Sequence, residues 1–559
     1  MVRSGVFLRK CKKALEIQKR SGIKGLFYEV GMHQRRRKNP GHRNDFGETA
    51  AYTYGDIQWV CPYMDCLDLK EFGTQIKLAV QVHVYYVELL DEIIRELNKI
   101  PYPWDCYVST NNKRKKKLIQ EKMKKTCRCV NLEVVVYPNR GRDVAPFLLQ
   151  MKDCICDYKY VCHIHTKKDR HSVYGDNWRK YLFRHLFGNA DYLERLFYLF
   201  EHNPEWGIVY PPVYPVVEKQ MQWGANEAGE RKLLERLGIT VKLPDVPEFP
   251  AGNMFWARTE SIKKIFAQNW SSKDFPIEAG QMDGTLAHQM ERAWVFAARK
   301  MGYQKKHVYN ACFCPDRLSE KKRLLVYAHY DRQQLVAKED WNTLSMFRKF
   351  CKQIYFVTNS RLGRMETEHV KTLADCVLER ENIGYDFGAW RDALLRLGKC
   401  SLDEFDELIL LNNSCILSKN DVRKMFYEME KKDLDFWGNT CSPFLSDGSY
   451  IGESVIGEHL QSYCLVFQKK VFASAVFWKF WEELPECRDR KEAIAKCETK
   501  LTQYFSKDGF FYGAYINESY YMNQLLGCSN ALYEKPEALV LLGSPFIKKA
   551  TGTGMDLEL

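Results

Sequence analysis

The residues best suited to bind an anionic group follow two short apolar runs in the first half of the chain. Residues 160–162 lead into His163-Ile164-His165-Thr166-Lys167, and residues 134–137 lead into the turn 139–143. Imidazole, hydroxyl, ammonium and guanidinium groups stabilise negative charge that develops on a leaving group. The candidate binding residues, including two from neighbouring segments, are His83, Asn139, Gly141, Arg142, Asp143, His163, His165, Thr166, Lys167 and Arg179.

Two carboxylates further along the chain are candidates for accepting a proton. Apolar residues recur at helical spacing over 286–297, and Glu291 lies on this predicted helix beside the apolar stripe, with Asp283 just before the helix. A positioned carboxylate that takes a proton from a hydroxyl group contributes on the order of 10² to 10⁴ in rate. We therefore expect Glu291 to be the catalytic base and Asp283 to be the second candidate. The alternative for Glu291 is a surface ion pair with Arg292 or Arg299.

A strand, a glycine turn, a helix and a second strand must position the binding residues. The β-branched run Val134–Tyr137 predicts a buried strand, and a helix is expected from Asp143 to about Met151. In an open α/β sheet, ligands bind outside the carboxyl ends of the strands, so both polar tips should face one crevice. As alternatives, Asp143 only caps its helix, and His83 and His165 are core histidines with satisfied hydrogen bonds.

The same unit occurs a second time. Asn382-Ile383-Gly384-Tyr385-Asp386 repeats the pattern Asn-x-Gly-x-Asp, and residues 405–414 correspond to residues 158–167. Glu291 precedes a Gly-Tyr pair by the same spacing at which a second glutamate precedes a Gly-Phe pair. The sequence therefore predicts a tandem duplication of one α/β domain. The candidate residues of the second copy are Asn382, Asp386, Asn412, Asn413 and Glu498.

These patterns predict four segments. They are a basic lead-in over 1–74, a first domain over 75–317, a second domain over 318–547 and a flexible tail over 548–559. The first copy carries an insert around 206–250, whose prolines favour ordered loop over helix.

Composition restricts the class of protein. The chain has 559 residues, 45% of them hydrophobic and 28% charged, as in ordinary globular proteins. The net charge is +13, with basic runs in the first 43 residues and over 113–125. Apolar residues are interspersed in the first run and favour contact with an anionic membrane face. The alternative is that these basic clusters are an ordinary solvated surface. Nucleic acid is not expected as a partner because no nucleic-acid-binding motif is present.

No apolar run is long enough to span a membrane and no signal peptide is expected, so the predicted location is the cytoplasmic side of the cell membrane, as a peripheral protein. The cysteines should then be reduced thiols. Pairs such as Cys127/Cys129 and Cys154/Cys156 suggest a metal site, but their spacing does not match common zinc motifs. We therefore expect no metal at these cysteines.

Several features resemble the GT-A glycosyltransferase fold: the Asn139-x-Gly141 turn, and Glu291 ahead of Gly302-Tyr303. More specifically, the strings NRGRDVAPFL, YVCHIHTKKDRH, GNMFWAR and DGTLAHQMERAW resemble the rhamnan synthesis protein F family, as do NIGYDFGAWRDAL, DFWGNT and HLQSYCLVF. The resemblance implies an α/β protein with two tandem GT-A-like, Rossmann-like domains. It also implies a glycosyltransferase that moves L-rhamnose from dTDP-rhamnose to a lipid-linked surface or cell-wall polysaccharide. The second copy is then either a second transferase with another linkage or a degenerate copy that binds glycan or supports the first.

The chain departs from the GT-A pattern at the position of the metal-binding Asp-x-Asp. The first copy has His165, Thr166 and Lys167 there, and the second copy has Asn412-Asn413-Ser414. Cationic side chains would replace the metal, so we predict metal-independent transfer without a cofactor, although a divalent cation stays possible. The alternative from another class is a non-catalytic scaffold that binds glycan or nucleotide sugar in an assembly complex. A third interpretation is an RNA-binding protein that uses the basic N-terminus, and it predicts steeply salt-dependent binding.

Overall fold

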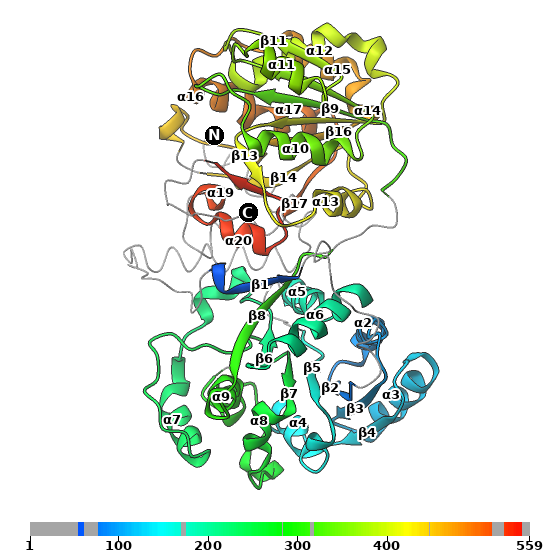
Figure 1. The fold of residues 1–559 in the computed structure, drawn as a ribbon, viewed down its shortest axis with the longest axis vertical. Coiled ribbons are helices and arrows are strands. Elements are labelled where there is room, and N and C mark those ends of the chain that lie inside the picture. Colours follow the sequence, from blue (N-terminus) through cyan, green and yellow to red (C-terminus); the bar gives the residue numbers. More distant parts are fainter. Residues whose placement is uncertain are drawn as a thin grey trace, which may run out of the picture. The chain divides into compact units, whose positions relative to one another are not determined.

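The chain has a mixed α/β fold built on two large sheets (Figure 1). The computed structural model describes residues 54–60, 76–168, 175–281, 283–312, 318–445, 448–516 and 530–549. It divides into two compact units, Met1–Cys312 and Phe313–Leu559. The basic run in the first 43 residues, and with it the predicted membrane contact, lies outside the described residues, as do residues 550–559 of the predicted tail. None of the described helices is long and apolar enough to cross a membrane.

The sheet of the first unit has parallel strands and one strand that runs against its neighbours. In the order in which they pair, its described strands are β1 (Ile57–Val60), β8 (Gln304–Asn310), β6 (Trp206–Tyr210), β7 (Phe255–Arg258), β5 (Tyr160–His165), β2 (Leu78–His83), β3 (Trp104–Thr110) and β4 (Leu132–Val136). Strand β7 is antiparallel to both β5 and β6. Because β2, β3, β4 and β5 are parallel, their carboxyl ends meet at one edge.

Strand β1 lies inside the predicted lead-in over 1–74. It pairs in parallel with β8, with Ile57 opposite His307. The first sheet therefore takes an edge strand from upstream of residue 75. The partner strand is far away in the sequence, so the four residues of β1 carry no local signal of this pairing.

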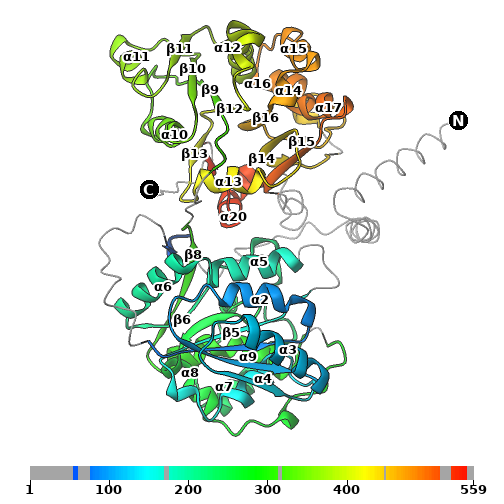
Figure 2. The same ribbon diagram turned by 90° about the vertical axis from the view of Figure 1, so that its right-hand side faces the viewer.

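Helices cover both faces of the first sheet (Figure 2). They are α2 (Leu90–Leu97), α3 (Lys113–Thr126), α4 (Val144–Met151), α5 (Gly175–Leu186), α6 (Ala190–His202), α7 (Glu227–Arg236), α8 (Thr259–Phe266) and α9 (Leu286–Lys300). Successive side chains of β7 point to opposite faces. The Phe255 ring lies 5.3 Å from that of Trp294 on α9, and the Trp256 ring lies 5.0 Å from that of Phe197 on α6. Both faces are therefore packed with aromatic side chains.

The insert over 206–250 contains a helix that its sequence pattern does not predict. Helix α7 forms between the proline-rich stretches, and it buries Leu233 and Leu234. It packs against α9. The prolines over 211–215 and 244–250 flank this helix. The expectation of ordered loop in the insert is therefore wrong for residues 227–236, which are helical, and for residues 206–210, which form strand β6.

The second unit repeats the strand order of the first. Its described strands are β11 (Cys376–Glu379), β10 (Gln353–Thr358), β9 (Arg323–His329), β12 (Glu407–Asn412), β16 (Cys464–Gln468) and β14 (Phe436–Ser442), and β15 (His459–Leu460) and β17 (Tyr512–Ile516) both pair with β14. Strand β16 is antiparallel to β12 and β14, as β7 is to β5 and β6. A small sheet joins β13 (Cys415–Leu417) to β18 (Phe546–Lys548). Among the helices of this unit are α10 (Lys338–Arg348), α12 (Tyr385–Leu402) and α17 (Thr499–Lys507).

A polar contact inside the sheets shows the same repeat at the level of side chains. In the first unit, Nδ1 of His83 at the end of β2 lies 2.9 Å from Oγ of Ser109 on β3. In the second unit, Nδ1 of His329 at the end of β9 lies 3.0 Å from Oγ1 of Thr358 on β10. The two units therefore share strand order, strand direction and a buried histidine contact, as expected for a tandem duplication.

Candidate active site

His163 lies at the centre of a buried polar network in the first unit. Its ring stacks on Phe147 of α4 at 4.3 Å between centroids. Nδ1 lies 2.8 Å from Oε1 of Gln81 on β2, and Nε2 lies 3.1 Å from Oδ2 of Asp143. Because His163 is fully buried and both ring nitrogens face oxygen atoms, it orients Asp143 and does not contact solvent.

Asp143 directly precedes α4, but its side chain caps no backbone N–H of that helix. Its Oδ2 instead accepts hydrogen bonds from Nδ2 of Asn253 at 2.6 Å and from His163. Burial alone would raise the pKa of Asp143, yet the nearby His165 and the hydrogen bonds from His163 and Asn253 hold it well below its usual value. Capping is thus not the role of Asp143, which is an ionised carboxylate at the carboxyl edge of the sheet.

The Gly252-Asn253 turn connects strand β5 to helix α9 through hydrogen bonds. The N–H of Gly252 donates to Oε1 of Glu291 at 2.8 Å, and the carbonyl of Gly252 lies 2.9 Å from Nε2 of His165. Asn253 accepts a hydrogen bond from Nε1 of Trp294 at 2.8 Å through its side-chain oxygen. Both residues have a left-handed φ, 90° and 50°. Asn253 is not among the residues predicted from the sequence, although a Gly-Asn pair before a strand is a signal for this conformation.

Glu291 projects from α9 toward this turn. It accepts one hydrogen bond, and its second carboxylate oxygen has no hydrogen-bond partner among the described residues. Burial raises the pKa of Glu291. The alternative ion pairs do not form, because Arg292 donates to the carbonyls of His288 and Gln222 and Arg299 pairs with Glu248. Glu291 is therefore available to accept a proton.

Asp283 is exposed, and its carboxylate binds the insert over 206–250 through hydrogen bonds. It accepts hydrogen bonds from the N–H of Ala225, at 2.9 Å, and from Nδ2 of Asn226. Burial opposes ionisation, but these hydrogen bonds lower the pKa of Asp283. On the other side of the same loop, Arg142 donates to the carbonyl of Gln281. Asp283 and Arg142 therefore hold residues 278–281 and 283–284 in place.

Three other predicted residues have mainly structural contacts. Burial lowers the pKa of His83 to about 3, so it is a neutral core histidine. Oγ1 of Thr166 accepts from the backbone N–H groups of Tyr85 and Tyr86. Arg179 pairs with Glu92 and Asp176 and donates to the carbonyl of Lys167, so its donors serve the packing of α5.

Of the remaining predicted residues, Lys167 places its ammonium group 3.7 Å from the ring centroid of Trp178. Asn139 is exposed, and its carbonyl accepts from the N–H of Glu278. Gly141 has a φ of 63° and lies against Phe275. The structure thus brings Asp143, His163, His165 and Glu291 together through Gly252 and Asn253, and it leaves Asn139 and Arg179 outside this network.

The second unit has a smaller polar network at the corresponding edge. Asn412 donates to Asp386 at 2.6 Å, and burial raises the pKa of Asp386 to about 6. Glu498 accepts from the hydroxyl of Ser462 at 2.8 Å, at the position where Glu291 accepts from Gly252. Asn382 accepts from Asn359, and Asn413 exchanges hydrogen bonds with the backbone of Tyr330. Asp386 and Asn412 therefore form the core of the second network, and Asn382 and Asn413 stabilise loops.

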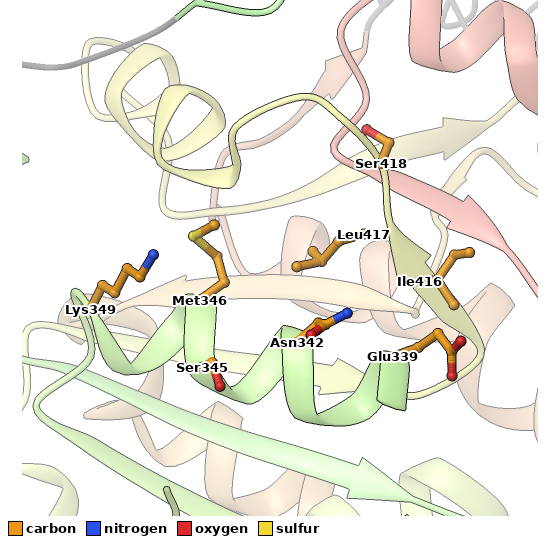
Figure 3. A pocket seen from close by; sticks show the side chains of 8 residues that line it. All are labelled: Glu339, Asn342, Ser345, Met346, Lys349, Ile416, Leu417 and Ser418. Carbon is orange, nitrogen blue, oxygen red and sulfur yellow. The ribbon is translucent and has the colours of Figure 1, made fainter. Parts of the chain in front are cut away.

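A separate pocket of about 360 Å³ lies between α10 and β13 in the second unit (Figure 3). Helix α10 and the residue after it contribute Glu339, Asn342, Ser345, Met346 and Lys349, and the opposite wall is Ile416, Leu417 and Ser418. It includes none of the candidate site residues. In the part of the chain that the structure describes, no group of three His, Cys, Asp or Glu side chains is placed to hold a metal ion.

The family model for rhamnan synthesis protein F matches residues 48–303 and 354–553, so the chain belongs to this family. The resemblance stated from the sequence is confirmed.

Curated relatives match over shorter stretches. The chain is 30% identical over 230 residues to the uncharacterized protein WxcX of two strains of Xanthomonas campestris pv. campestris, which covers 40% of this chain and 32% of the relative. It is 28% identical over 171 residues to the uncharacterized protein y4gN of Sinorhizobium fredii. This match covers 28% of this chain and 39% of the relative. The chain thus spans about a third of the length of the relatives it matches. Among solved structures, the apo-form glycosyltransferase GlyE of Streptococcus pneumoniae aligns with 64% of this chain and 89% of its own, at 10% identity and a TM-score of 0.12.

Proposed function

We propose that the protein is a glycosyltransferase of surface or cell-wall polysaccharide synthesis and that the first unit carries the active site. The observation that supports this most is the contact of Glu291 with the Gly252-Asn253 turn, which connects this glutamate to His165 and Asp143. A carboxylate with a raised pKa and an unpaired oxygen thus lies beside cationic and imidazole groups at the carboxyl edge of the sheet. Ligands of open α/β sheets bind at such an edge.

The proposed reaction follows from these groups. The acceptor hydroxyl attacks the anomeric carbon of a nucleotide sugar and gives its proton to Glu291. The bond between that carbon and the diphosphate oxygen breaks, and the nucleoside diphosphate leaves with the bonding electrons. Lys167 stabilises the negative charge on the leaving diphosphate, and this cationic stabilisation underlies a metal-independent mechanism. Burial lowers the pKa of His165, which holds the Gly252 carbonyl through Nε2 and so positions the turn that contacts Glu291. Asp143, held by His163 and Asn253, binds the ribose or base.

The donor and acceptor in this proposal come from the family. Its description as a rhamnan synthesis family favours dTDP-L-rhamnose as donor and a lipid-linked polysaccharide as acceptor. Such an acceptor places the enzyme at the inner face of the cell membrane. The antiparallel strand β7 between β5 and β6 is compatible with two tandem GT-A-like domains.

Nucleotide binding tests this proposal. Wild-type protein is titrated with dTDP, UDP and GDP by isothermal calorimetry, with and without manganese, beside Lys167→Met. The matched control is Lys152→Met, because Lys152 is exposed after the last turn of α4, away from the network. We expect dTDP to bind without metal and Lys167→Met to weaken binding at least tenfold, with the control unchanged. If no nucleotide binds, the non-catalytic scaffold becomes the better explanation.

A further inference from the structure

Strand β5 of the first unit is followed by Lys167, but the corresponding strand β12 of the second unit is not followed by a basic residue at that position. The two strands can be aligned through their antiparallel neighbours, because Tyr160 pairs with Arg258 and Glu407 pairs with Gln468 at the start of the two ladders. In this alignment Ser414 stands at the position of Lys167. The strand end that carries an ammonium group in the first unit therefore carries only a hydroxyl group in the second.

A lysine from the far end of the chain fills this position. Strand β18 pairs with β13 so that Lys548 lies opposite Cys415. The Lys548 ammonium donates to the hydroxyl of Ser414 at 2.7 Å, and the residue is only 8% exposed. The second unit therefore also has a positive charge at the end of this strand, although a different segment supplies it.

Lys548 is connected to the candidate carboxylate of the second unit through a chain of hydrogen bonds. The Ser414 hydroxyl donates to the side-chain oxygen of Asn412, and Nδ2 of Asn412 donates to Asp386. Asp340 pairs with the neighbouring Lys549, and no ion pair of Lys548 is found among the described residues. The two other donors of the Lys548 ammonium group are therefore available to a ligand.

The surroundings of this lysine fit an anionic ligand. Its ammonium group lies 5.5 Å from the ring centroid of Tyr533, and Arg490 donates to the hydroxyl of that tyrosine. Burial raises the pKa of Asp386, a carboxylate of the same network, to about 6, and the positive charge of Lys548 offsets part of this effect. A buried ammonium group without a carboxylate partner is costly to keep, and an anionic ligand would offset that cost.

We propose that the second unit has a diphosphate-binding site of its own, in which Lys548 donates to phosphate oxygens and Ser414 orients the ammonium group. This inference rests on the proposed function, because it assigns the ligand class from the reaction proposed for the first unit. In that reaction the nucleotide sugar carries a diphosphate, and the lipid-linked acceptor would carry one if its lipid were a prenyl diphosphate. The shared chemistry is therefore the diphosphate group.

Calorimetric titration of the full chain tests the second site. The probes are dTDP, UDP and GDP for the nucleotide source and farnesyl diphosphate for the prenyl source. The variants are Lys548→Met, which keeps the apolar stem of the side chain, and Ser414→Ala, which removes the hydrogen bond that orients it. Lys500→Met is the control, because Lys500 is half-exposed on α17 and pairs with Glu453. Thermal melting shows whether each variant is folded.

We expect wild-type protein to show two binding sites, and we expect Lys548→Met to weaken one of them at least tenfold while Lys167→Met weakens the other. Loss of farnesyl diphosphate binding alone identifies the acceptor as the ligand, and loss of nucleotide binding alone identifies the donor. If both Lys548→Met and Ser414→Ala bind every probe as the wild type does, the second site is refuted. The function proposed for the first unit still stands in that case if Lys167→Met loses binding. If only the Lys548 variant loses binding, the first-unit proposal fails and the second site stands.

Discussion

Replacing Glu230 with glutamine should stabilise the first unit at alkaline pH. Glu230 is fully buried on α7, where this helix packs against α9, and neither carboxylate oxygen has a hydrogen-bond partner among the described residues. Burial raises the pKa of Glu230 to about 8, and the positive charge of Arg292 offsets only part of this effect. The carboxyl group is therefore protonated in the folded protein at neutral pH.

The magnitude follows from proton linkage. The pKa of this carboxyl group rises from its ordinary value of 4.5 to about 8 in the folded chain. Each pH unit between these values corresponds to about 1.4 kcal/mol, so the free energy of unfolding should fall by roughly 3 to 5 kcal/mol as pH rises through this window. The free energy of unfolding decreases with rising pH because, in this window, the folded state keeps a proton that the unfolded state has lost. Glutamine carries no titrating proton, so Glu230→Gln should lack this decrease.

Calorimetric melting between pH 5 and pH 9 measures the effect. At about 2 to 4 °C for each kcal/mol, the melting temperature of the first unit should differ between variant and wild type by roughly 10 °C more at pH 9 than at pH 5. The matched control is Glu235→Gln, because Glu235 is exposed on the same helix. Equal pH dependence in wild type and Glu230→Gln would refute the argument that this carboxyl group is buried and unpaired.

Three further predictions concern the candidate site of the first unit. Gly141→Val should destabilise this unit by about 2 to 4 kcal/mol in chemical denaturation, because φ is 63° and a Cβ atom would lie 2.5 Å from the Phe275 ring; an unchanged midpoint would contradict this. Asn253→Ala removes the hydrogen bonds to Asp143 and Trp294 and should lower the free energy of unfolding by about 2 to 4 kcal/mol. Additive effects in the Asp143→Asn/Asn253→Ala double mutant would contradict a direct interaction between these two side chains. Chelation with EDTA should leave sugar transfer unchanged, and loss of activity that manganese restores would show that the reaction needs a metal.

Much of the fold can be predicted because it depends on local patterns. The β-branched run near Val134 and the helical spacing around Glu291 predict β4 and α9, and the repeated Asn-x-Gly-x-Asp motif predicts the duplication. By contrast, β1 and α7 depend on partners distant in the sequence. β1 is only four residues long and pairs with β8, and α7 is stabilised by packing on α9.

The candidate site is predictable in its residue types and less so in its connections. The sequence leaves Asp143 either to cap a helix or to bind a ligand, and only the structure shows that His163 and Asn253 hold it. The sequence suggests that Arg179 binds the diphosphate, but this arginine pairs with Glu92 of α2. The residues around Arg179 in the sequence give no sign of that partner. Lys548 has no motif of its own, since only the pairing of β18 with β13 brings it to the site.

The most direct test of the account is the rate of rhamnose transfer from dTDP-rhamnose to a lipid-linked glycan acceptor by wild-type protein and by Glu291→Gln. The control is Glu260→Gln, because Glu260 is exposed at the start of α8. If Glu291 is the catalytic base, its replacement should lower the rate by about 10² to 10⁴ and leave nucleotide binding unchanged. Transfer by Glu291→Gln at the wild-type rate would contradict the assignment of the active site to the first unit.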